Sequence, residues 1–205
     1  MRRKVFDVLA SLGGALMVVV LLIAGALLLW GANFANSNVS SQLKQQAITF
    51  PNKAAFAHPV AGGEITPSMI PSVSKYAGQP LTTGTQAKVY ANDFIAQHIK
   101  EIGGGKSYAQ LSAAAMALPK GSAAYNAAEA KVQTVFQGTT LRGLLLEAYG
   151  FSVFGRIANI AAVAAFIMAG LMALLVAFGV WHARRTPATA EISVGHSVPA
   201  GLATT

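Results

Sequence analysis

The side chains best suited to acid–base or metal chemistry lie between two long apolar stretches of this 205-residue chain. Two histidines and five carboxylates make up the set: His58, His98, Glu64, Asp93, Glu101, Glu129 and Glu147. Only His98 and Glu101, three residues apart, are expected to share a helix face. A metal site usually needs three or four converging ligands with supporting hydrogen bonds. We therefore predict no catalytic, metal or cofactor site, and expect His98 to be a partly buried, hydrogen-bonded helix residue.

A glycine run followed by lysine and serine, Gly103-Gly104-Gly105-Lys106-Ser107, resembles part of a phosphate-binding loop. That loop requires a further glycine at the position occupied by Lys100, and it follows a strand. Here the run follows an expected helix. A helix that ends at the glycines, with Ser107 as the N-cap of the next helix, explains each residue and is our prediction.

The elements that position these residues are the two apolar stretches on either side of them. Residues 5–32 and 151–181 each exceed the roughly 20 residues that a helix needs to cross the apolar part of a bilayer. A secretory signal peptide is the alternative for the first stretch, with Ala24-Gly25-Ala26 as a formal cleavage site. The apolar residues continue well past that site, so we expect a retained transmembrane helix.

The basic residues close to the ends of the stretches predict the orientation. They lie on the outer flank of each stretch: Arg2, Arg3, Lys4, Arg184 and Arg185. Residues 1–4 and 182–205 are therefore expected to be cytoplasmic, the latter as a disordered tail, and residues 33–150 extracytoplasmic. The location that follows is the plasma (inner) membrane.

The formal net charge of +8 does not indicate nucleic-acid binding. Apart from the flanking clusters, the lysines are scattered singly and form no stripe. Attraction to the headgroups of the lipid bilayer is the more natural use of this charge. The chain contains no cysteine, so residues 33–150 must fold without disulfides.

The region between the apolar stretches is predicted to be mainly helical. The first helix is expected to continue through residues 33–46. A Pro/Gly-rich irregular connector is expected to occupy residues 51–85, with a β-hairpin somewhere in it as the alternative. Apolar residues at helical spacing then predict a helix over residues 86–102.

A short helix over residues 108–118 follows, and a last helix starts near Ser122 and continues, with a bend at Gly138, into the second apolar stretch. The predicted fold class is an all-α membrane protein, with two transmembrane helices and a small, mainly helical extracytoplasmic domain.

Within the second apolar stretch, small residues recur every four positions and predict a helix-packing interface: Ala161, Ala165, Ala169, Gly170, Ala173 and Ala177. Such stripes let two helix backbones approach closely. Two interpretations remain open. The stripe packs the two spans of one chain together, or it contacts another membrane protein or a second copy of this chain.

Three segments together resemble a known group of proteins. They read VSSQLKQQAITF, VYANDFIAQHIKEIGGGKSYAQL and TLRGLLLEAYGFSVFG, the last entering the second apolar stretch. In this order the chain resembles small two-pass membrane proteins of actinobacteria that have no established biochemical role, some of which carry an aromatic ring-opening dioxygenase label. Such dioxygenases need a His/carboxylate iron site inside a soluble fold, and His58 and His98 do not assemble one.

The sequence therefore favours a non-enzymatic integral membrane protein. We expect an accessory or assembly subunit of a larger cell-envelope or respiratory membrane complex, whose partners are other membrane subunits or a second copy of the chain. The alternative is an extracytoplasmic ligand-binding or sensor module anchored by two helices.

Overall fold

The computed structural model describes residues 3–187, and all regular elements among them are helical. One isolated antiparallel bridge joins Thr49 to Pro80 in this part of the chain. The chain divides into two compact units. Unit 1 contains the described parts of Met1–Leu29 and Ile160–Thr205, and unit 2 is Trp30–Asn159.

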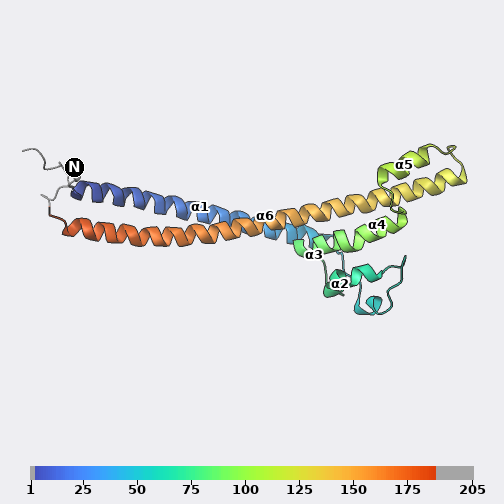
Figure 1. Cartoon of the computed structure of the whole chain (residues 1–205), viewed down its shortest axis with the longest axis horizontal. Helices are drawn as coiled ribbons and strands as arrows, with labels where there is room; N and C mark the ends of the chain where they lie inside the picture. Colours follow the sequence, from blue (N-terminus) through green and yellow to red (C-terminus); the bar gives the residue numbers. More distant parts are fainter. Residues whose placement is uncertain (1–2, 188–205) are drawn as a thin grey trace, which may run out of the picture. The chain divides into compact units, whose positions relative to one another are not determined.

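Two helices, α1 (Arg3–Gln45) and α6 (Ala123–Arg185), contribute to both units (Figure 1). Each is long enough and apolar enough to span a membrane. The expected extension of the first helix beyond the apolar stretch is confirmed, because α1 ends at Gln45. Ala47, with φ of +52°, then turns the chain out of the helical path.

In unit 1, α1 and α6 lie side by side and run in opposite directions (Figure 1). Glycines allow this close approach. A Cβ atom added at Gly14 would lie 2.7 Å from a methyl group of Val176, and one added at Gly25 would lie 2.9 Å from the Phe166 ring. Most of the large apolar side chains of this unit are exposed. A pair of helices with small residues inside and large apolar residues outside suits a lipid environment.

Unit 2 adds a series of short helices to the remaining parts of α1 and α6. Three 3₁₀ turns and one α-helical turn come first: η1 (Lys53–Phe56), η2 (Pro67–Met69), α2 (Ile70–Val73) and η3 (Ser74–Tyr76). One continuous helical run follows, formed by α3 (Gly84–Val89), the π-helical η4 (Tyr90–Ile95) and α4 (Ala96–Ile102). The last short helix is α5 (Tyr108–Met116).

Residues 51–85 are irregular apart from short helical turns, as expected, but they also contribute to the core of unit 2. Much of this core comes from that segment and from Phe50 beside it, with Phe50, Met69, Val73 and Leu81 all fully buried. The apolar residues recur at irregular intervals because they lie on short turns, so neither a helical nor a strand period is visible in the sequence. The segment contains no β-hairpin.

Local capping places the helix boundaries close to where the sequence predicts them. At the end of α4, Gly104 and Gly105 have φ of +59° and +77°. The Gly105 N–H donates to the Lys100 carbonyl and the Gly104 N–H to the Glu101 carbonyl, which closes the helix in a Schellman motif. Ser107 then caps α5 and exchanges hydrogen bonds with Gln110 in a capping box. The glycine run is therefore a helix stop followed by an N-cap, as predicted.

The helix α6 continues through Gly138 without interruption, and a Cβ atom there would lie 2.9 Å from Ile99, so this glycine makes room for α4. The bend expected at this position stays a prediction, whereas the expected end of the helix is wrong. The helix also includes residues 182–185, which were expected to begin a disordered tail. Residues 188–205 of that tail lie outside the described part of the chain.

Candidate functional site

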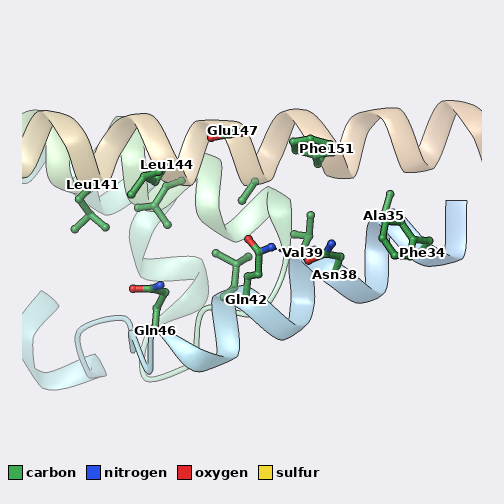
Figure 2. Close-up of a pocket in the computed structure, with 13 residues that line it drawn as sticks. Phe34, Ala35, Asn38, Val39, Gln42, Gln46, Leu141, Leu144, Glu147 and Phe151 are labelled. Carbon is green, nitrogen blue, oxygen red and sulfur yellow. Dashed lines mark hydrogen bonds between the residues drawn. The ribbon is translucent and has the colours of Figure 1, made fainter. Parts of the chain in front are cut away.

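A groove of about 500 Å³ lies between α1 and α6 in unit 2 (Figure 2). We call it the α1–α6 groove. Its lining comes from the last three turns of α1, Gln46 after them, and the facing turns of α6: Phe34, Ala35, Asn38, Val39, Gln42, Leu43, Gln46, Leu141, Leu144, Leu145, Glu147, Ala148 and Phe151.

The floor and the rim of the groove differ in exposure. Buried aliphatic side chains form the floor, namely Val39, Leu43 and Leu145. At the rim, Phe34, Leu144 and Phe151 are 59%, 60% and 53% exposed. Large apolar side chains exposed together in this way are typical of a surface that receives another molecule.

Polar side chains also line the groove, most of them on α1 or just after it. Asn38 and Gln42 project from this helix, and the Gln42 amide donates a 2.7 Å hydrogen bond to Asn38 (Figure 2). Glu147, one of the carboxylates singled out in the sequence, is an exposed lining residue on α6. The lining contains no histidine, cysteine or serine. Its composition therefore suits the binding of an amphipathic or apolar molecule.

The predicted alanine stripe divides into two groups in unit 1. Ala165 and Ala169 are 6% and 1% exposed and Ala161 is half-buried, whereas the other members, Gly170, Ala173 and Ala177, are exposed. The physical reason is the helix period. Residues four apart are separated by about 400° of rotation, so a strict four-residue stripe turns about 40° at each step and leaves the contact face.

A series of buried and half-buried positions in unit 1 follows an alternating three- and four-residue spacing instead. On α6 they are Ala162, Ala165, Ala169, Met172, Val176, Gly179 and Ala183. On α1 they are Asp7, Ser11, Gly14, Val18, Leu21, Gly25 and Leu28. This is the spacing of a left-handed pair of helices. Packing within the chain thus accounts for Ala165 and Ala169, with Ala161 half-buried beside this face, while a contact of the other three with a second protein stays a prediction.

Three of the candidate acid–base residues, Glu64, His98 and Glu101, line one open pocket of about 550 Å³ in unit 2. His98 Nδ1 lies 2.8 Å from the Phe94 carbonyl oxygen, and its ring packs on Phe94 with centroids 4.5 Å apart. These contacts confirm His98 as a partly buried, hydrogen-bonded helix residue. Within residues 3–187, no three His, Cys, Asp or Glu side chains are close enough to hold a metal ion. His58, Asp93 and Glu129 line neither this pocket nor the groove.

The His98 ring ends a row of aromatic side chains in the core of unit 2. Tyr90 lies between Phe50 and Phe94, at centroid distances of 5.2 Å and 4.7 Å. Burial raises the pKa of the Tyr90 hydroxyl above its ordinary value, and the negative charge of Glu64 raises it further. Tyr90 therefore stays protonated at neutral pH and serves as a packing residue.

Two polar contacts join residues too distant in sequence to be paired by inspection. In unit 2, Arg142 donates a 2.9 Å hydrogen bond to Asn92 on the π-helical turn η4, and its buried Nε has no partner within the described residues. In unit 1, His182 Nε2 lies 3.9 Å from the carboxylate of Asp7. The paired residues are 50 and 175 positions apart, so no local sequence pattern predicts either contact.

The geometry thus provides an amphipathic groove in unit 2 and a close helix pair in unit 1. Comparisons of the chain with protein-family models, with curated proteins and with solved structures found no match.

Proposed function

We propose that this protein is a non-enzymatic accessory or assembly subunit of a larger membrane complex of the cell envelope, and that the α1–α6 groove receives an apolar helix of a partner subunit. The observation that carries the proposal is the exposed apolar rim of the groove in unit 2. Phe34, Leu144 and Phe151 are all more than half exposed although unit 2 has a well-buried core of its own. A helix laid in an apolar groove is a common mode of protein recognition.

The dimensions of the groove support a helical occupant. Its lining on and just after α1 extends from Phe34 to Gln46, which corresponds to roughly 18 Å at 1.5 Å per residue. Three turns of a partner helix would occupy this length. Phe34 follows the apolar stretch at residues 5–32 by two positions, and Phe151 is the first residue of the stretch at 151–181, so a partner helix that leaves the bilayer beside this protein would meet the groove directly.

The topology proposed with this function places both termini in the cytoplasm of a cell with a plasma (inner) membrane, and unit 2 outside it. Basic residues on the outer flanks of the two apolar stretches support this orientation. Because the chain has no cysteine, a single cysteine in place of the 75% exposed Met116 provides a unique label. A membrane-impermeant maleimide should label this cysteine in intact cells. Labelling only after lysis would mean that the orientation is the opposite of the one proposed.

The test of the docking surface is the substitution Leu144→Glu at the rim of the groove. The full-length protein, expressed at its native level and extracted in a mild detergent, should elute in a particle much larger than 21.2 kDa with stoichiometric partners. Leu144→Glu should release those partners, because it buries a charge in an apolar contact. Met116→Glu, on an even more exposed apolar residue outside the groove, is the control.

A lone monomer of the wild-type protein, or a particle unchanged by Leu144→Glu, would overturn the docking proposal. The groove volume favours one alternative, since about 500 Å³ lies within the range of small-molecule sites. In that case the monomer should carry an amphipathic small molecule that Leu144→Glu removes, and the protein would be a ligand-binding or sensor module.

A further inference from the structure

A second cavity of unit 2, of about 410 Å³, is lined by α1, by α6 and by the turn that begins α3. We call it the Lys44–Arg156 pocket, after the two charged residues in its lining. No carboxylate lines it. Hydroxyl and amide side chains make up most of the remaining wall, including those of Ser40, Thr85 and Asn159.

The two cations of this pocket have no anionic partner. The single contact between acidic and basic side chains within residues 3–187 is that of His182 with Asp7, so neither Lys44 nor Arg156 forms an ion pair there. Two other basic residues of unit 2 have side-chain partners: Arg142 donates to Asn92, and the Lys88 ammonium group lies 5.0 Å from the centre of the Tyr149 ring.

The helix directions favour an approach of the two side chains. Side chains of an α-helix lean toward its N-terminus. Lys44 lies near the end of α1, whereas Arg156 lies on the antiparallel α6, so each side chain leans along its own helix toward the level of the other. Both line the same cavity. A cavity with two cations and no carboxylate in its lining attracts an anion.

Close backbone contacts fix the walls of the pocket. A Cβ atom added at Gly84 would overlap the Ser152 side chain, which shows how tightly the first turn of α3 packs on α6. On the other side, a Cβ atom added at Gly155 would lie 2.9 Å from Asn36 Oδ1 and 3.3 Å from the Ala32 carbonyl oxygen. The pocket is therefore a feature of the packed unit.

Internal hydrogen bonds decide which polar groups remain available. The Thr82 and Thr83 hydroxyls both donate to Gln86 Oε1, at 3.3 Å and 3.1 Å, and the Ser152 hydroxyl donates to the Tyr149 carbonyl. The side chains of Ser40, Thr85 and Asn159 make no hydrogen bond within the described residues. They supply neutral donors around the two cations.

The position in the sequence indicates where the anion comes from. Arg156 and Asn159 directly precede the charge-free apolar run at residues 160–181. One turn of helix, about 5.4 Å, separates Arg156 from that run. Lipid headgroups occupy this level beside a membrane-spanning helix.

We propose that the Lys44–Arg156 pocket binds the phosphate of an anionic lipid headgroup in the leaflet next to unit 2. The Arg156 guanidinium can hold two phosphate oxygens in a fork, and the Lys44 ammonium group adds a point charge. This site shares only Val39 with the lining of the α1–α6 groove and does not depend on the function proposed for it.

The test titrates the full-length protein, in a mild non-ionic detergent, with short-chain phosphatidylglycerol and with phosphatidylcholine, and counts bound lipids by native mass spectrometry. Phosphatidylglycerol should bind as a 1:1 complex and phosphatidylcholine much more weakly. The double variant Lys44→Gln/Arg156→Gln should weaken phosphatidylglycerol binding by about tenfold or more, since each lost hydrogen bond to a charged group is worth about a factor of ten.

Two further variants keep the result interpretable. Lys106→Gln/Lys131→Gln removes the same charge at exposed positions that line no described cavity, and it should bind phosphatidylglycerol like the wild type. Lys44→Arg/Arg156→Lys keeps both charges. It should retain most of the phosphatidylglycerol binding if Lys44→Gln/Arg156→Gln weakens binding through the loss of charge. Circular dichroism checks that each variant is folded.

Inorganic phosphate distinguishes a lipid from a soluble ligand. Displacement of phosphatidylglycerol only by a large excess of phosphate supports the headgroup. If inorganic phosphate binds, phosphatidylglycerol does not, and Lys44→Gln/Arg156→Gln loses the phosphate binding, the pocket is a phosphate site for a soluble ligand. Equal binding of phosphatidylglycerol to the wild type and to Lys44→Gln/Arg156→Gln, or no binding of either probe, overturns the proposal.

Discussion

Units 1 and 2 contain parts of the same two helices but bury different kinds of side chain. Among the described residues of unit 1, no buried residue is larger than alanine; the set is Gly25, Ala162, Ala165, Ala169 and Ala183. Unit 2 buries Phe50, Met69, Val73, Leu81 and Val135 almost completely. The large apolar residues of unit 1 are instead mostly on its outer surface.

The difference follows from the solvent that each packing pattern suits. In water, the burial of apolar surface is favourable by about 25 cal/mol per Å², so large side chains belong inside. In lipid this gain is absent, and helices associate through close backbone contact and van der Waals packing. The buried residues of unit 1 therefore match the packing expected of helices in lipid, and those of unit 2 match the packing expected of a domain in water.

The largest expected effect is in the core of unit 2. Phe50→Ala removes a ring that is 2% exposed and packs against Tyr76 and Tyr90, and it should lower the free energy of unfolding by about 3–5 kcal/mol. Urea denaturation followed by circular dichroism in mild detergent measures this change. Phe154→Ala, at a ring that is 68% exposed, is the control and should cost far less. Equal losses of unfolding free energy in the two variants would mean that unit 2 lacks a core of large buried apolar side chains.

A smaller effect should separate the two faces of α6 in unit 1. Ala169→Leu places a large side chain at a position that is 1% exposed, and overpacking should cost about 1–3 kcal/mol and lower the Tm in detergent. Ala173→Leu, one turn further along, places the same side chain at an exposed position and should leave the Tm of the isolated protein unchanged.

The same pair also tests the second interpretation of the alanine stripe. If Ala173→Leu releases a partner protein without a change in Tm, the exposed part of the stripe contacts that partner. A Tm loss shared by both variants would show that the helix pair is packed with a different face.

The smallest effect concerns the pH dependence of unit 2. The pKa of Tyr90 is raised above 10.0 by burial and by Glu64, so the folded state holds its proton to higher pH than the unfolded state does. The contribution of Tyr90 to stability is complete below pH 10 and declines as the pH rises through the folded-state pKa. Urea denaturation at several alkaline pH values measures the free energy of unfolding. This free energy should decline less steeply with pH for Tyr90→Phe than for the wild type. Glu64→Gln should have a higher free energy of unfolding than the wild type at the same alkaline pH. Identical alkaline limbs for all three proteins would contradict this account.

Local signals in the sequence were sufficient for most helix boundaries. Residues 86–102 have apolar side chains at helical spacing, Gly103-Gly104-Gly105 provides the left-handed residues of a Schellman motif, and Ser107 caps the next helix. Each of these signals depends on residues within a few positions of one another. The continuation of the first helix beyond residue 32 was predictable for the same reason, since residues 33–45 contain neither proline nor glycine.

The features that were missed depend on contacts between distant residues. The core contribution of residues 51–85 arises only when short turns meet α1 and α6. The Lys44–Arg156 pocket combines residues more than 100 positions apart, and the α1–α6 groove does the same. The alanine stripe shows a different limit: the four-residue repeat was visible, but only the helix period of 3.6 residues determines how much of it stays on one face.

The π-helical turn η4 has a consequence for changes in chain length. A π turn accommodates one more residue than an α turn before its hydrogen bond closes. The helical run from Gly84 to Ile102 thus contains the equivalent of a single-residue insertion, absorbed between Tyr90 and Ile95. An extra residue in a regular α-helix would rotate everything after it by about 100°. Here the wide turn takes up that rotation between Tyr90 and Ile95, so the residues of α4 after it keep their direction relative to α3.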